Sequence, residues 1–142
     1  MKTFLLILCL LNFWIIPQPN YQFQHINSDA GLSSNTVTCV LQDHIGFLWI
    51  GTYDGLNKYD GYDFKVFKHN PDDLTSIGAN AIQTLYEDKQ GVIWIGTFDG
   101  GLSRYDPKTE KFTRYLINPY DLTSLSSNKV YAICEDDEEY LW

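Results

Sequence analysis

Two segments of the chain repeat each other residue by residue. Residues 35–55 read NTVTCVLQDHIGFLWIGTYDG and residues 80–100 read NAIQTLYEDKQGVIWIGTFDG, so every landmark is shifted by 45 positions. A third copy begins at Asn128, passes through Asp136 and reaches Trp142, with a shift of 48 from the second copy. A repeat period of roughly 20 to 50 residues indicates stacked supersecondary units rather than one ordinary domain.

Each unit has the pattern of short strands separated by turns. In the first unit we expect strands at residues 37–42, 47–52, 56–59 and 64–68, with turns at Asp43 to Gly46, Tyr53 to Gly55 and Asp60-Gly61. A helical solenoid is the alternative at this period, but no stretch keeps a 3.6-residue periodicity. Four short antiparallel strands in about 45 residues are typical of a β-propeller blade. The predicted fold class is therefore all-β, with four-stranded blades in an incomplete ring.

The repeat also predicts how the chain is divided. Residues 20–142 form a partial β-propeller, with a latch strand at 21–26, blade 1 at about 32–69, blade 2 at about 77–117 and the start of blade 3 at about 125–142. The latch strand is a fourth strand without its first three, and in a closed ring it would pair with strands from the far end. A ring of typically 4 to 8 blades cannot close from these parts. We therefore expect the sequence to be a fragment or a truncated reading frame.

Residues 1–19 have the features of an export signal. Lys2 precedes an apolar run at residues 4–16, which ends at Pro17 and Pro19. This run has the length of a signal-peptide core and is shorter than the roughly 20 residues that span a bilayer. No small-x-small cleavage site follows it, so an uncleaved anchor and a buried core segment stay open as alternatives. We therefore expect an exported protein.

Composition excludes several classes of partner. The 142 residues include 10 Lys+Arg and 18 Asp+Glu, which gives a formal charge of -8, and no basic run interrupts this balance. Nucleic-acid binding needs clustered cations, so no nucleic-acid partner is expected for this segment. Three scattered cysteines, Cys9, Cys39 and Cys134, are too few for a disulfide scaffold or a zinc site, and buried thiols are expected for Cys39 and Cys134.

The repeated residues could suggest ligands, but their recurrence favours structural roles. Trp49, Trp94 and Trp142 could stack on sugar rings, yet they recur at a strand centre, which favours packing between blades. Asp54 and Asp99 precede Gly and are expected to form turns rather than bind calcium or a sugar hydroxyl. Turn-forming roles are likewise expected for the remaining repeated aspartates, Asp43, Asp88 and Asp136.

No catalytic residue, metal ligand or cofactor follows from the sequence. The acidic run at residues 135–139 lacks the spacing of a calcium loop and is expected to be a solvated turn, and His25, His44 and His69 have no partner at metal-ligand spacing. A ligand site must break the symmetry of the repeat. Tyr62, His69 and Tyr120 do differ between units, but they do not define a site, so the ligand-binding residues stay unknown.

Several segments together resemble a known family. GLSSN at 31–35, GFLWIGT at 46–52, DGLNKYDG at 54–61, GVIWIGT at 91–97 and DGGLSRYD at 99–106 resemble two-component regulator propeller repeats. The resemblance implies the amino-terminal, periplasmic sensor part of a hybrid two-component system histidine kinase, with every catalytic part beyond Trp142. For the full-length protein it implies an oligosaccharide ligand, a homodimer and an inner-membrane anchor. This segment would meet the membrane only through a missing carboxyl-terminal part or an uncleaved signal.

Two other functions stay open from the residues alone. A secreted β-propeller enzyme, such as a lyase or glycosidase, would need a central cluster of carboxylates, His or Tyr that breaks the repeat, and these blades show none. A lectin-like binding or scaffold protein would need only the blades. The resemblance, and not the composition, favours the sensor.

Overall fold

A computed structural model describes residues 22–142, so the predicted signal at 1–19 lies outside the described residues. A 3-10 turn, η1 (Ser28–Ala30), is followed by eight strands. The first four are β1 (Val37–Gln42), β2 (Leu48–Thr52), β3 (Gly55–Tyr59) and β4 (Phe64–Phe67). The next four are β5 (Ile82–Glu87), β6 (Ile93–Thr97), β7 (Leu102–Asp106) and β8 (Lys111–Tyr115).

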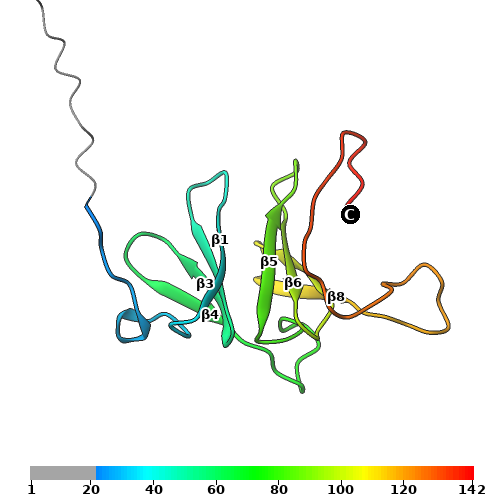
Figure 1. Ribbon diagram of the computed structural model, residues 1–142, viewed down its shortest axis with the longest axis horizontal. Helices are drawn as coiled ribbons and strands as arrows, with labels where there is room; N and C mark the ends of the chain where they lie inside the picture. Colours follow the sequence, from blue (N-terminus) through cyan, green and yellow to red (C-terminus); the bar gives the residue numbers. More distant parts are fainter. Residues whose placement is uncertain (1–21) are drawn as a thin grey trace, which may run out of the picture.

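The strands form two separate four-stranded antiparallel sheets. Their orders are β1-β2-β3-β4 and β5-β6-β7-β8, so each sheet is a simple meander. The two sheets lie side by side in Figure 1, with the second sheet following the first along the chain. Both first strands carry an irregularity at the same place, between Val37 and Cys39 and between Ile82 and Thr84. The all-β fold of propeller blades predicted from the repeat is confirmed.

Turn chemistry explains why the strands end where they do. The Asp60 carboxylate accepts the backbone N–H groups of Tyr62 and Asp63, both at 2.8 Å, and Gly61 adopts a φ of 101°. Short polar side chains and glycine are the residues that allow a chain to reverse in so few positions. The β3 to β4 hairpin therefore follows from the Asp-Gly pair.

The core lies between the two sheets. Trp49 of the first sheet packs edge-on against Tyr105 of the second, with ring centroids 4.9 Å apart, and Phe67 lies 5.4 Å from Phe112. Gly51 keeps this interface close, because a Cβ there would lie 2.7 Å from Cγ2 of Ile82. A small residue in the second strand is thus required by the approach of the next blade. Blade–blade packing is what buries the apolar surface of each unit.

The third unit forms a hairpin with few backbone hydrogen bonds between its two arms. Cys134 and Trp142 exchange backbone hydrogen bonds of 3.0 and 2.8 Å, and Glu135 and Leu141 form a single antiparallel bridge. Backbone bonds from Val130 to Thr97 and from Gly101 to Asn128 join this unit to blade 2. The start of blade 3, expected at about residues 125–142, therefore contains one isolated bridge and no assigned strand. A strand is stabilised by neighbours on both sides, and here the hairpin has one.

Two further expectations concern the predicted latch strand and the cysteines. Residues 22–26 are exposed and lie in no strand, and the predicted latch pairing with distant strands stays a prediction. Cys39 is half-buried, and burial raises the pKa of its thiol. The expectation of a buried thiol is wrong for Cys134, which is exposed. Its hairpin contacts blade 2 on one side, and the third unit forms no sheet among residues 22–142.

Candidate functional site

The ends of the sheets at which the turns from β1 to β2 and from β5 to β6 lie, here called the turn edge, carry a repeated carboxylate–indole unit. Oδ1 of Asp43 accepts the backbone N–H groups of residues 45, 46 and 47 at 3.1, 2.9 and 2.9 Å, while Oδ2 accepts the indole Nε1–H of Trp49 at 2.8 Å. Asp43 is buried, so both of its oxygens are satisfied within the turn and the strand that follows. The aspartate therefore closes the turn and orients the tryptophan for packing.

The same unit recurs at the same edge in the next two repeats. The indole of Trp94 donates to Asp88 and that of Trp142 donates to Asp136, both at 2.7 Å. The expected turn-forming role of these aspartates agrees with the geometry, whereas the indole contact was not foreseen. A signal for it exists in the sequence, because an aspartate precedes each repeated tryptophan by six positions.

Burial of the three tryptophans differs although their local geometry repeats. Trp49 is 1% exposed between the two sheets, whereas Trp142 is 75% exposed. Trp94 is half-buried and lines an open pocket of about 570 Å³ together with Tyr115 and Leu141. Packing between blades is therefore realised at Trp49, where the next blade is present.

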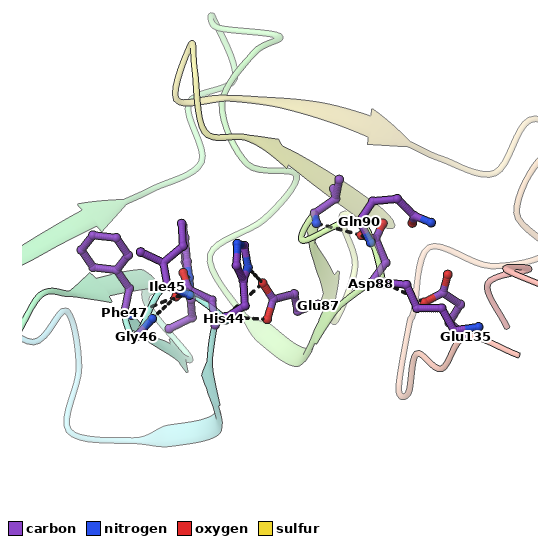
Figure 2. A network of polar contacts seen from close by, with 12 residues as sticks. His44, Ile45, Gly46, Phe47, Glu87, Asp88, Gln90 and Glu135 are labelled. Carbon is purple, nitrogen blue, oxygen red and sulfur yellow. Dashed lines mark hydrogen bonds and ion pairs between the residues drawn. The ribbon is translucent and has the colours of Figure 1, made fainter. Parts of the chain in front are cut away.

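A second repeated contact links neighbouring units at this edge (Figure 2). The backbone N–H of His44 donates to the Glu87 carboxylate at 2.9 Å, and the ring Nδ1 of His44 also contacts that carboxylate. In the next unit the N–H of Lys89 donates to Glu135 at 2.9 Å. The hydrogen bond that the Glu87 carboxylate accepts from the His44 ring raises the pKa of His44 above its usual value. The turn of one blade is thus tied to the first strand of the next.

The acidic run is therefore only partly a solvated turn. Glu135 accepts from Lys89, and Glu139 accepts from the Gln90 side chain at 3.0 Å, so both join the link between units. The Asp136 carboxylate accepts the indole and two backbone N–H groups, which lower its pKa. Asp137, Glu138 and Glu139 are the exposed members of the run.

The opposite ends of the strands, where the turns after β2 and β6 lie, carry a pocket that the repeat alone does not predict. This pocket, of about 380 Å³, lies where the turn after β2 meets the connection from β4 to β5, and its chemistry comes from Tyr53, His69, Asn80 and Asp99. Because the meander alternates direction, this edge is distinct from the edge of the carboxylate–indole units. Tyr53 lines this pocket and is 58% exposed.

Hydrogen bonds fix most of the pocket wall. The Asn80 carbonyl accepts from Gly55 at 2.8 Å and its Oδ1 accepts from the backbone N–H of His69 at 2.7 Å. The His69 ring donates through Nδ1 to the Ile77 carbonyl at 2.8 Å, which leaves Nε2 as the free ring nitrogen. The pocket therefore offers a flat aromatic face, an amide, an imidazole and a carboxylate from a preorganised wall.

The candidate residues that break the repeat are dispersed over the molecule. His69 lines the pocket with Tyr53, whereas Tyr62 is exposed in the β3 to β4 turn and Tyr120 is exposed in the connection after β8. His25 is exposed near the start of the described residues. Tyr53 and Asp99 were assigned to turns, and their part in a pocket follows only from the approach of two blades.

The connections between units also contain a repeated loop motif, which we did not predict from the sequence. Residues 70–76 read NPDDLTS and residues 118–124 read NPYDLTS. In both loops the serine hydroxyl accepts the N–H of the leading asparagine, at 2.8 and 2.9 Å, and donates to its carbonyl at 3.0 Å. In the first loop the Arg114 guanidinium also donates to the Asp73 and Ser76 carbonyls, at 2.6 and 2.7 Å. Each loop is therefore closed by a serine that bonds back to its leading asparagine.

Two features are absent from residues 22–142. It contains no group of three or more His, Cys, Asp or Glu side chains that could hold a metal ion. It also contains no helix long and apolar enough to cross a bilayer.

Comparisons with known proteins agree with the repeat and the fold. The sequence model of the family described as two component regulator propeller matches residues 31–54, 76–99 and 124–142. A solved structure, described as the extracellular domain of hybrid two component system BT3049 from B. thetaiotaomicron, has a TM-score of 0.76 and 37% identity over 84% of this chain. A second, from system BT4673 of the same organism, has a TM-score of 0.67 and 28% identity over 86% of this chain.

A curated relative is similar over a shorter stretch. Histidine kinase P4 of Formosa agariphila is 50% identical over 58 residues, which is 41% of this chain. The fold, the repeated carboxylate–indole units and these matches define a protein built of propeller blades. Residues 31–54, 76–99 and 124–142 of this chain match two-component regulator propeller repeats. It spans 4% of the length of the histidine kinase and 17% of each of the two solved structures.

Proposed function

We propose that this chain is the amino-terminal part of an extracytoplasmic sensor propeller in a hybrid two-component system. The observation that carries the proposal is the similarity across 84% of the chain to a protein described as the extracellular domain of such a system. The kinase name of the Formosa agariphila relative supports the same assignment. In this proposal, signal transfer across the membrane and phosphoryl transfer belong to parts of the protein outside residues 1–142.

The proposed ligand is an oligosaccharide, and the proposed location is the periplasm. An open aromatic face beside amide, imidazole and carboxylate groups supports a ligand that combines a flat apolar ring face with polar substituents. The apolar run at residues 4–16 supports export. Homodimerisation of the whole protein, which would carry the signal to a kinase, is part of the same proposal.

Two measurements on the 1–142 chain test this function. Expression in a Gram-negative host should place the chain outside the cytoplasm, and Leu6→Arg, which interrupts the apolar run, should retain it inside. The exported chain should then bind members of an oligosaccharide panel in calorimetric titrations. Recovery of the wild-type chain in the cytosol with Met1 intact would contradict export. Absence of binding to every saccharide in the panel would contradict carbohydrate sensing.

A further inference from the structure

The pocket between blades 1 and 2 differs from the corresponding place between blade 2 and the third unit. The Tyr53 position corresponds to Phe98, and the Ala81 position corresponds to Lys129. In the second place the Lys129 ammonium lies over the Phe98 ring, 4.9 Å from its centroid. In the first place Ala81 lines the pocket instead, and no Lys or Arg among residues 22–142 lies over the Tyr53 ring.

The carboxylate of the same pocket also lacks the cation that its counterpart has. Asp54 forms an ion pair with Lys68 at 2.7 Å, whereas the residue corresponding to Lys68 in the next unit is Leu116. Among the described residues, no Lys, Arg or His forms an ion pair with Asp99. Asp99 is exposed and lines the pocket that Tyr53 opens onto.

Both groups are of the kind that attracts an ammonium ion. An aromatic face attracts a cation within about 6 Å of its centroid, and a carboxylate forms short charge-assisted hydrogen bonds with N–H donors. Lys68 is the nearest cation in sequence to the pocket residue His69, and its charge is balanced by Asp54. The formal charge of -8 for the chain also favours the approach of a cation.

We propose that this pocket binds the ammonium group of an amino sugar, with the ammonium over the Tyr53 ring and Asp99 as its counter-ion. The choice of a sugar rests on the proposed function. The choice of an ammonium group rests on Lys129 and Lys68, which contact Phe98 and Asp54 but have no counterparts at Tyr53 and Asp99. The ligand ammonium takes the place over Tyr53 that the Lys129 side chain takes over Phe98. The Asn80 amide and Nε2 of His69 then face the sugar hydroxyl groups.

The test is a calorimetric titration of the exported 1–142 chain with two matched probes. A glucosamine tetrasaccharide should bind, and the fully N-acetylated tetrasaccharide, which has the same rings but no charge, should bind at least about tenfold more weakly. Tyr53→Ala and Asp99→Asn should each weaken glucosamine binding about tenfold. Phe98→Ala, the matched change in the next unit, should leave it unchanged.

A third variant for the same titration uses a substitution taken from the repeat itself. Ala81→Lys installs the side chain that the next unit carries over its aromatic ring, so it should fill the pocket and abolish glucosamine binding. Circular dichroism of each variant controls for folding. Equal binding of both probes, or binding indifferent to Tyr53→Ala and Ala81→Lys, would overturn the proposal. If neutral saccharides bind while the glucosamine probe does not, the amino-sugar site is wrong and the sensor function stands. If no saccharide binds, both are wrong.

Discussion

At the scale of single residues, an aspartate six positions before a tryptophan defines each unit. The carboxylate of Asp43 satisfies three backbone donors with one oxygen and the Trp49 indole with the other. A buried indole N–H without a partner would cost free energy, so the aspartate allows a large aromatic side chain to lie in the interface between blades.

Substitution of Asp43 separates the two tasks of its carboxylate. Asp43→Ala removes both sets of hydrogen bonds and should lower the free energy of unfolding by about 2 to 4 kcal/mol. Asp43→Asn keeps one oxygen acceptor for the turn, so it should cost about half as much. Urea denaturation followed by tryptophan fluorescence measures both. Equal stability of the alanine variant and the wild type would show that the turn needs no carboxylate.

The residue scale also shows what sequence reasoning could reach. Turn-forming roles for Asp43, Asp88 and Asp136 were predictable, because short polar side chains favour such turns. Their indole partners were not predicted, since turn chemistry considers only local backbone groups. The pocket residues Tyr53 and Asp99 belong to turns in different blades, so their proximity depends on packing between blades and not on local pattern.

At the scale of elements, strand positions followed from the sequence more closely than loop structure. The strand expected at residues 37–42 has those bounds, and the others differ by one residue at an end. Alternation and Gly-containing turns fix such short strands. The irregular connections at 70–76 and 118–124 were missed, because their order comes from side chain to backbone hydrogen bonds that no periodicity reports.

The two loops form a matched pair for measuring the contribution of Arg114. Their internal hydrogen bonds are the same, but only loop 70–76 is contacted by Arg114 in the described structure. The amides of Asp73 and Ser76 should therefore exchange more slowly than those of Asp121 and Ser124 in hydrogen-exchange measurements. Arg114→Lys cannot donate through a planar fork and should remove the difference. Equal exchange in the wild type would contradict a role for Arg114.

The contact between His44 and Glu87 should depend on pH. Because Glu87 raises the folded-state pKa of His44, the contact stabilises the fold below the ordinary histidine pKa of about 6.5, and this contribution is lost as the pH rises through the folded value. An NMR titration should show the His44 pKa falling in Glu87→Gln. Glu135→Gln, the same position in the next unit, should leave the His44 pKa unchanged. A His44 pKa indifferent to Glu87→Gln would contradict the assignment.

At the scale of the whole molecule, the sequence repeat by itself predicts an architecture of stacked blades. Two blades pack through Trp49, Phe67, Tyr105 and Phe112, and the third unit repeats the turn edge while lacking a sheet among the described residues. The division at residues 1–19 and the latch at 21–26 stay predictions, because their evidence would come from cleavage and from strands elsewhere in a ring.

The reading frame that follows Trp142 tests the central claim most directly. If this chain begins a sensor propeller of a two-component system, sequencing should reveal further units with an aspartate six positions before a tryptophan. A single apolar span of about 20 residues and histidine kinase motifs should come after these units. A stop codon after Trp142, with no related sequence beyond it, would contradict the account and favour a truncated gene product.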